Sequence, residues 1–298
     1  MNQNKNLIYR FSQFISLLLG ARFFVLIFFT FGLYVSTFFL FNQEESLRSF
    51  VFDIKVHGII FCSLLSIAAG GLINQFYDLE KDKIQKPFRS KLQSFLKQKY
   101  FLYMYVILNA VSLSIAAILS WRIFVFFLIY QFVMWFYSHK LSKIFIVNNL
   151  TYVSLSLYPF FGLLVYYQHF SWKLFWMAAF LFLLLWIIDI MKDILTMRPD
   201  KLFGYSTIPL KIGIKKTTIV ISILLVLNAL VAYLVVVFAP RFNFVVIYFS
   251  LSALVLAASL WPVFYFRIKR IFWLMNVLRF WIFIGVIFLL LNGIFEKF

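Results

Sequence analysis

Apolar runs of about twenty residues recur along this chain, and they limit its possible folds more than any motif does. A helix needs about 20 apolar residues to cross the hydrocarbon core of a bilayer. The chain is 64% hydrophobic and only 13% charged, with a mean hydropathy of +0.96. A membrane β-barrel would instead show short alternating segments. We therefore expect an all-α polytopic membrane protein, with its helices around a central cavity that opens near the cytoplasmic side.

Nine of these runs are predicted to be transmembrane helices, and together they form one membrane-embedded domain over residues 1–298. The predicted spans are 14–41, 56–77, 101–120, 122–138, 145–167, 172–192, 216–238, 243–265 and 271–294. The single cysteine, Cys62, excludes an intramolecular disulfide and a cysteine-rich metal site.

The distribution of Lys and Arg orients these spans. If the N-terminus lies inside, 20 of the 28 basic residues fall on the inner side and six on the outer side, with Arg22 and Arg279 within or near spans. This is the bias of the positive-inside rule. It predicts an integral protein of the inner or plasma membrane with a cytoplasmic N-terminus, an outer C-terminus and an active site that faces the cytoplasm. The net charge of +18 then reflects topology and anionic lipid head groups, and we expect no nucleic acid partner.

The ten acidic residues are scarce enough for their positions to carry information. Four fall on the outer side: Glu44, Glu45, Asp53 and Glu296. The other six lie at the inner ends of the second and sixth spans or in the loops that follow: Asp78, Glu80, Asp82, Asp189, Asp193 and Asp200. These two spans run in the same direction about 110 residues apart, which indicates an internal pseudo-repeat. Its two acidic motifs, at 74–82 and 189–200, would face one cavity.

Both motifs repeat at the spacing of a helical turn. Asn74, Asp78 and Asp82 are four residues apart. The second stripe, if its helix continues far enough, contains Asp189, Asp193, Thr196 and Asp200. Like charges at this spacing repel, and bound Mg²⁺ together with substrate phosphate oxygens would neutralise them. Acids, flanking bases and an apolar interior indicate a substrate with a diphosphate head and a hydrocarbon tail. Solvated charges at the membrane interface are the simpler alternative.

Several segments carry a family resemblance. The segment NQFYDLEKD fits the pattern Asn-x-x-x-Asp-x-x-x-Asp, and KIQKPFR follows it as a Lys/Arg-Pro-x-Arg stretch. The segment KDILTMRPDKLFGYSTIPLKIG is similar to Asp-x-x-Asp-x-x-x-Asp-x-x-x-Gly-x-x-Thr-x-Pro with its short apolar-Gly ending. WFYSHKLSK is similar to a Tyr-Ser segment after a fourth helix, with Asn148 or Asn149 as the asparagine that follows. In this order, and with nine helices, the chain resembles the UbiA-type intramembrane prenyltransferases.

The resemblance implies Mg²⁺-dependent transfer of a polyprenyl group from a prenyl diphosphate to a small lipophilic or aromatic acceptor within the lipid bilayer. Matched residue by residue, it implies catalytic roles for Asp78, Asp82, Asp193 and Tyr137. The metal ligands would be Asn74, Asp78, Asp82, Asp193 and Asp200, with Asp189 and Thr196 as further candidates. The diphosphate would be bound by Asn74, Lys86, Arg89, Lys140, Lys143 and Lys192.

Four positions depart from the family pattern: Gln75, Ser90, Ser142 and Thr196. Thr196 matters most, because it stands where the second motif has its middle aspartate and so removes a negative charge. Asp189 lies on the same helical face one turn before Asp193, and it would compensate for that loss.

The acceptor is less clearly encoded than the donor. Members of the family prenylate aromatic acids and quinone precursors, tetrapyrroles or glycerol phosphate lipids, and we place an aromatic acceptor first and a glycerol phosphate lipid second. Arg22, inside the first predicted span, would meet an acceptor carboxylate or phosphate, or else snorkel to the interface. Tyr137 would stabilise an allylic cation with its ring. A cation-coupled transporter and an inactive paralogue are the alternatives from other classes.

Overall fold

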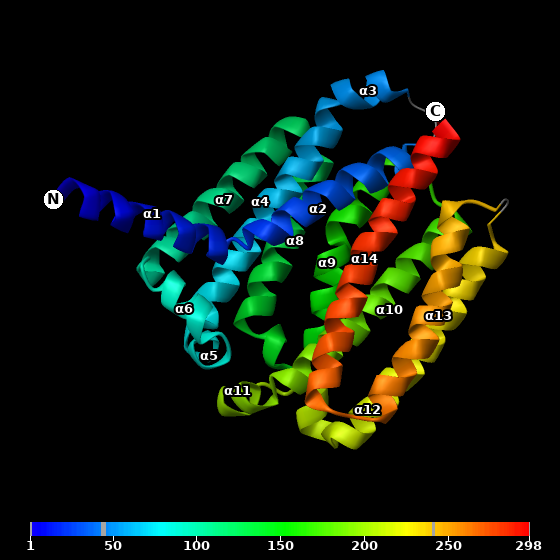
Figure 1. Ribbon diagram of the computed structural model, residues 1–298. Helices are drawn as coiled ribbons and strands as arrows, with labels where there is room; N and C mark the ends of the chain where they lie inside the picture. Colours follow the sequence, from blue (N-terminus) through cyan, green and yellow to red (C-terminus); the bar gives the residue numbers. More distant parts are fainter. Residues whose placement is uncertain (1, 43–45, 240–241, 298) are drawn as a thin grey trace. The chain divides into compact units, whose positions relative to one another are not determined.

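The computed structural model describes residues 2–42, 46–239 and 242–297 (Figure 1). Regular structure in these ranges is helical throughout, and nine of the helices are long and apolar enough to cross a membrane. The expectation of an all-α membrane fold with nine spans is therefore confirmed. Glu44, Glu45 and Arg241, which the charge analysis assigns to the outer side, lie outside the described residues.

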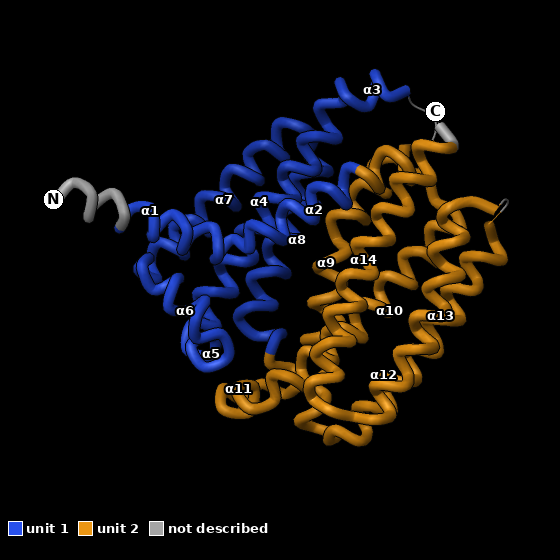
Figure 2. The backbone as a smooth tube through the Cα atoms, viewed as in Figure 1, with its two compact units in different colours: residues 1–34, 46–142 blue, residues 35–45, 143–298 orange. Residues whose placement is uncertain are grey.

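The chain divides into two compact units (Figure 2). Unit 1 contains residues 1–34 and 46–142, and unit 2 contains residues 35–45 and 143–298. The first acidic motif belongs to unit 1 and the second to unit 2, so each is described within its own unit. The single domain over residues 1–298 stays a prediction.

Unit 1 is built around a long buried helix. Its helices are α1 (Asn2–Gly20), most of α2 (Phe23–Ser36), α3 (Leu47–Phe52), α4 (Ile54–Tyr77), α5 (Leu79–Gln85), α6 (Pro87–Gln93), α7 (Gln98–Leu119) and α8 (Trp121–His139). Helix α4 packs against α7 and α8, and α1 packs against α6. Hydrogen bonds reinforce the first of these contacts, because Gln131 Nε2 donates to Ser66 Oγ at 3.2 Å and Ser66 Oγ lies 3.2 Å from Ser112 Oγ.

The division between α7 and α8 follows from a capping residue. Ser120 has an extended backbone, with φ −177° and ψ 147°, and its hydroxyl oxygen accepts a hydrogen bond from Arg122 N at 3.3 Å. A serine in this conformation ends one helix and caps the next. The predicted separation of these two spans near Trp121 is therefore correct.

Unit 2 is a bundle with a continuous apolar core. Its helices are η1 (Thr37–Phe41), α9 (Val147–Tyr167), α10 (Trp172–Leu195), α11 (Met197–Leu202), α12 (Ile208–Val237), α13 (Phe244–Phe264) and α14 (Ile268–Lys297). Ile187, Ile221 and Leu278 are fully buried in the core that α10, α12, α13 and α14 share. The short helix η2 (Leu141–Lys143) lies where the chain passes from unit 1 to unit 2.

Two predicted spans differ from the structure at their N-terminal ends. The first span begins at Phe23, because a turn at Ala21 and Arg22 separates it from α1, and Arg22 has a left-handed φ of 56°. Arg22 thus lies at the start of the span and not inside it. Helix α12 begins at Ile208 instead of 216 and is interrupted at Gly213, where φ is 79° and ψ is 162°. Hydropathy does not register the break at Arg22, since apolar residues continue on both sides of it. At Gly213 the flanking lysines Lys211, Lys215 and Lys216 lower the hydropathy, so the predicted span begins only after the break.

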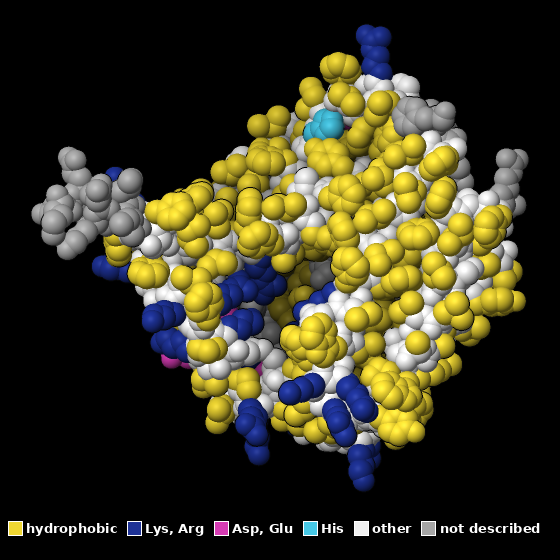
Figure 3. Space-filling view, in the orientation of Figure 1, with side chains coloured by type: hydrophobic (Ala, Val, Ile, Leu, Met, Phe, Trp, Pro, Cys, Tyr) yellow, Lys and Arg dark blue, Asp and Glu magenta, His cyan; other side chains and the backbone are white. Residues whose placement is uncertain are grey.

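Large apolar side chains cover most of the face shown in Figure 3. Exposed large apolar side chains lie on the spans, among them Val106, Ile118 and Phe132. Lys and Arg gather over the α5–α6 end of unit 1 and over the α11–α12 end of unit 2 (Figures 1 and 3). An apolar surface on the spans with bases at their ends is that of an integral membrane protein.

Candidate active site

The first acidic motif lies where α4 gives way to α5. Backbone hydrogen bonds continue through it at every turn, from Asp78 N to Asn74 O at 2.9 Å and from Asp82 N to Asp78 O at 2.8 Å. The helix bends at Asp78, whose φ is −94° and ψ is 9°, without losing this winding. Asn74, Asp78 and Asp82 therefore lie on successive turns of one continuous helical path. Asp82 is buried, whereas Asn74 and Asp78 are half-buried.

Three cations, Lys86, Arg89 and Arg22, are grouped at the end of this motif, where Lys86 and Arg89 interact with Asp82. Lys86 Nζ lies 3.2 Å from Asp82 Oδ1, and Arg89 donates from Nη2 to Leu19 O at 2.6 Å. Burial lowers the pKa of Lys86, and the charges of Arg22 and Arg89 lower it further, while Asp82 opposes them. Burial and the charge of Arg22 likewise lower the pKa of Arg89, against Asp82. This group therefore has a surplus of positive charge that a bound anion would relieve.

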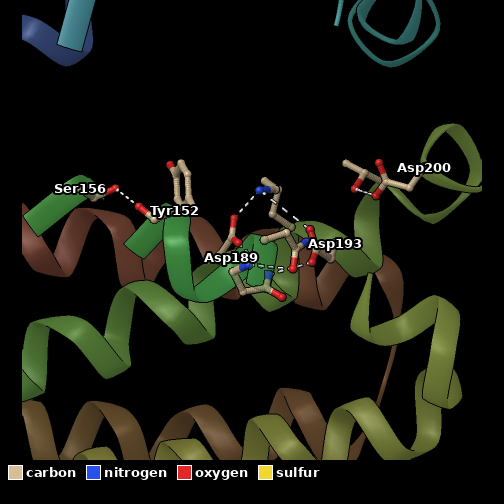
Figure 4. Close-up of polar contacts among 9 residues, drawn as sticks. Tyr152, Ser156, Asp189, Asp193 and Asp200 are labelled. Atoms are coloured by element: carbon tan, nitrogen blue, oxygen red, sulfur yellow. Dashed lines mark hydrogen bonds and ion pairs between the residues drawn. The ribbon is translucent and has the colours of Figure 1, made fainter. Parts of the chain in front are cut away.

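The second acidic motif is built differently (Figure 4). Asp189 and Asp193 are one turn apart on α10, and their side chains are almost completely buried. Asn149 on α9 joins them, because its Nδ2 donates to Asp189 Oδ2 at 2.7 Å and to Asp193 Oδ2 at 2.9 Å. Lys192 Nζ pairs with Asp189 Oδ1 and lies 3.9 Å from Asp193 Oδ1. The same ammonium is 4.9 Å from the centre of the Tyr152 ring.

The predicted stripe from Asp189 to Asp200 bends at Thr196. Helix α10 ends at Leu195 and the short helix α11 begins at Met197, with Thr196 between them at φ −107° and ψ 9°. Backbone hydrogen bonds continue through the bend, from Thr196 N to Lys192 O and from Asp200 N to Thr196 O, both at 3.0 Å. Thr196 Oγ1 donates to Asp200 Oδ2 at 2.6 Å, and both residues are buried. Thr196 therefore orients Asp200, while Asp189 is held by Lys192 and Asn149. In Figure 4, Asp200 stands apart from the Asp189–Asp193 pair.

The remaining predicted residues divide between the units. Tyr137 lies half-buried in the last turn of α8, and Lys140 follows as the exposed C-cap of that helix. Lys143 belongs to unit 2, where its carbonyl oxygen accepts from Ser206 N at 3.1 Å. Its Nζ lies 5.6 Å from the centre of the Tyr205 ring. Lys143 is thus fixed to the segment that follows Asp200.

The donor set of the second motif suits Mg²⁺. Two buried carboxylates are joined by the Asn149 amide, whose buried Oδ1 has no hydrogen-bond partner among the described residues. Carboxylate and amide oxygens are ligands of hard cations. Within the described ranges, however, no three Asp, Glu, His or Cys side chains are grouped closely enough to form a complete metal site. The remaining oxygen ligands would have to come from the substrate or from water.

Sequence reasoning did not find the bridging role of Asn149. The motif comparison named Asn148 or Asn149 without a partner, because spacing along one helix cannot identify a contact across 40 residues. The structure distinguishes the two asparagines. Asn148 Oδ1 accepts from Asn149 N at 2.7 Å, and the Asn149 side chain donates to the carboxylates. The contact of Tyr152 with Lys192 also had no signal in the sequence.

Comparison with known proteins identifies the family. The family model described as the UbiA prenyltransferase family matches residues 35–271, which is most of the chain and includes both acidic motifs. The chain belongs to this family. The family resemblance drawn from the motifs is thereby confirmed.

Two relatives similar to this chain are named digeranylgeranylglyceryl phosphate synthase. The chain is 30% identical over 188 residues to the enzyme of this name from Pyrococcus furiosus, a match that covers 61% of this chain and 66% of that protein. It is 29% identical to the enzyme of the same name from Sulfurisphaera tokodaii, over 56% of this chain and 62% of the relative. The chain thus spans less than two thirds of the length of these relatives.

Solved structures confirm the fold of the UbiA chain. A structure of digeranylgeranylglyceryl phosphate synthase has a TM-score of 0.70 and 19% identity, and the match covers 95% of this chain and 99% of that one. A UbiA homologue from Archaeoglobus fulgidus bound to GPP and Mg²⁺ has a TM-score of 0.67 and 14% identity, covering 92% and 98% of the two chains. At these identities the likeness concerns the fold alone.

Proposed function

We propose that this UbiA chain transfers a polyprenyl group from a prenyl diphosphate to the hydroxyl group of a glycerol phosphate lipid within the membrane. One observation carries the choice of acceptor: the similar curated relatives are named digeranylgeranylglyceryl phosphate synthase. These relatives favour the lipid, which the sequence analysis placed second, over the aromatic acceptor that it placed first.

The two acidic motifs supply the groups for the donor. In our proposal Asn74, Asp78 and Asp82 hold one Mg²⁺, and Asp193 and Asp200 hold another. Bound Mg²⁺ would neutralise the charge that develops on the leaving diphosphate. The cations beside the first motif, Lys86 and Arg89, and the bases Lys140, Lys143 and Lys192 would bind its outer oxygens. The surplus of positive charge beside Asp82 supports this assignment.

The reaction then proceeds by breaking one carbon–oxygen bond and forming another. The allylic C–O bond of the donor breaks, and its electron pair leaves with the diphosphate. The ring of Tyr137 would stabilise the allylic cation through its π face. The acceptor hydroxyl oxygen attacks the cation, forms the new ether bond and releases its proton. Apolar side chains around the bound donor would exclude water, which would otherwise convert the cation to an alcohol.

An acceptor panel tests this proposal. Purified protein is incubated with Mg²⁺, geranylgeranyl diphosphate and one acceptor at a time from a set of glycerol phosphate lipids, phenolic acids and naphthoates, and products are read by mass spectrometry. We expect an ether product with the lipids alone, and its loss when EDTA removes Mg²⁺. Product with the aromatic acids alone would overturn the acceptor and keep the family reaction. Diphosphate release with none of them would overturn prenyl transfer to these classes.

A further inference from the structure

We propose that Lys192 is the resident counter-ion of the second acidic motif, and that a divalent cation must displace it to bind there. The inference rests on the proposed function, because it assigns the metal at the same site. It makes Lys192 a positioning residue that opposes binding of the metal until the substrate arrives.

The first argument is that donors already occupy the carboxylates. The Lys192 ammonium pairs with Asp189 Oδ1 and lies 3.9 Å from Asp193 Oδ1. The Asn149 amide donates to the other oxygen of each, Asp189 Oδ2 at 2.7 Å and Asp193 Oδ2 at 2.9 Å. Three of the four carboxylate oxygens thus accept from an N–H group, and the fourth lies near the same ammonium. A cation that binds between these carboxylates would lie beside the Lys192 ammonium and compete with it for their negative charge.

The second argument is electrostatic. The two carboxylates are 2% and 3% exposed, so water does little to screen charges between them. An ammonium and a divalent ion held together between these carboxylates would repel each other strongly. The Lys192 side chain is 38% exposed and has a flexible stem, so it can withdraw toward solvent. The phosphate oxygens of a bound diphosphate would then accept the displaced ammonium.

The third argument comes from Asn149. Its side chain is fully buried, and its Oδ1 has no hydrogen-bond partner in the described part of the chain. Rotation of the amide by half a turn would present this oxygen to the carboxylates in place of the NH₂ group. Asn149 would then change from a donor that bridges two carboxylates into a third oxygen ligand beside them. The metal-free and metal-bound states would therefore share Asn149, Asp189 and Asp193, with Asp200 as the further ligand in the metal-bound state.

A metal titration without substrate tests the proposal. Asp78→Asn and Asp82→Asn together remove the first motif from the full-length protein, and Mn²⁺ binding to the second is followed by electron paramagnetic resonance. In this background we expect Lys192→Met to tighten Mn²⁺ binding about tenfold or more, because it removes the competing charge. Lys192→Gln should tighten it similarly, and Lys192→Arg should bind like the background. Lys201→Met, which removes an exposed lysine of α11, is the matched control and should change nothing.

The outcomes decide between two roles for Lys192. If both neutral variants leave Mn²⁺ affinity unchanged, weaken it, or show no binding, the lysine does not compete with the metal and the proposal is overturned. If Lys192→Met does not fold, Lys192→Gln gives the answer alone. The titration needs no turnover, so a failed acceptor panel with tighter Mn²⁺ binding would overturn the proposed function and leave this inference intact.

Discussion

The two acidic motifs have the same spacing of aspartates and opposite electrostatic surroundings. In unit 1, Asp82 faces Lys86, Arg89 and Arg22, so positive charge is in excess. In unit 2, the buried Asp189 and Asp193 contact one ammonium and one neutral amide. Two carboxylates against one ammonium leave an excess of negative charge, which the amide N–H groups partly stabilise. Each motif thus contains two aspartates four residues apart, while the partners of those aspartates differ.

This difference gives the two motifs different tasks. A half-buried acidic turn with surplus cations is arranged to receive an anion together with its metal. A buried pair of carboxylates with internal donors is arranged to receive a cation that replaces those donors. We therefore expect the first motif to govern binding of the diphosphate and the second to govern the requirement for metal.

The largest expected effect comes from removing a single aspartate from either motif. Asp78→Ala, Asp82→Ala and Asp193→Ala should each lower kcat/KM by at least about 100-fold, because each removes a proposed metal ligand. The variants of the two motifs should differ in the free energy of unfolding. Asp193→Ala removes one of the two carboxylate acceptors of the buried Asn149 amide and should cost about 1–3 kcal/mol, whereas Asp78→Ala, at a half-buried residue, should cost less. Thermal unfolding without metal measures this difference.

Glu80 provides the control for these variants. It is an exposed acid on the same short helix, paired with Lys83 at 2.6 Å. Glu80→Ala should keep the activity of the parent, since an exposed ion pair contributes little. Equal loss in Glu80→Ala and Asp82→Ala would show that general charge, and not the turn-by-turn spacing, carries the activity.

Arg22 tests whether the cations of unit 1 also bind the acceptor. We assign it to the acceptor phosphate, so Arg22→Met should raise KM for the lipid about tenfold and change KM for the diphosphate less, since a charge-assisted hydrogen bond is worth about 1.5–3 kcal/mol. Steady-state kinetics with each substrate varied in turn separates the two. Arg10→Met, an exposed arginine of α1, should alter neither value. A rise confined to the diphosphate KM would move Arg22 to the donor.

Variants of Thr196 test how the charge around Asp200 in unit 2 affects stability and metal binding. Thr196→Val removes the hydroxyl that donates to Asp200 and should cost about 1 kcal/mol of stability with a several-fold loss of activity. Thr196→Asp sets a second carboxylate beside Asp200, so repulsion should lower the unfolding temperature without metal. Added Mg²⁺ should then raise that temperature more than it does in the parent. An equal rise in both proteins would place Thr196 outside the metal site.

The smallest effect, with no change in activity expected, concerns topology. The charge bias predicts that both motifs open to the cytoplasm. Cysteines replacing the exposed Phe88 of unit 1 and Leu202 of unit 2, in a Cys62→Ser background, should both resist an impermeant thiol reagent in intact cells and react after lysis. A cysteine at the exposed Phe52 should react in both conditions. Opposite labelling at Phe88 and Leu202 would contradict the shared orientation. Ser90, which is buried, is a poor site for this test.

The sequence predicted the parts of the structure that depend on local pattern. Apolar runs identified nine spans to within a few residues for most of them, and the spacing from Asn74 to Asp82 survives as successive backbone-bonded turns. The break at Arg22 was missed because an arginine with positive φ has no signature in hydropathy. The bend at Thr196 was missed because the polar residues keep their spacing and the backbone hydrogen bonds continue across it.

The partners of the site residues depend on tertiary contacts, and the sequence gives no rule for them. Asn149 lies 40 residues from Asp189, and their hydrogen bond requires α9 to pack against α10 at one particular register. The competition between Lys192 and a metal follows from that register and from burial. Neither can be read from residue types along one helix.

Gly213 has a mechanical consequence. A Cβ at this position would meet nothing within 4 Å, so the glycine is required by its backbone angles and not by space. The break detaches the first residues of α12, from Ile208 onward, from the long span that follows. The non-helical residues 203–207 connect this detached segment to α11, which carries Asp200. A displacement of Asp200 when metal binds can therefore be absorbed at a hinge, and the membrane-crossing part of α12 need not tilt in response.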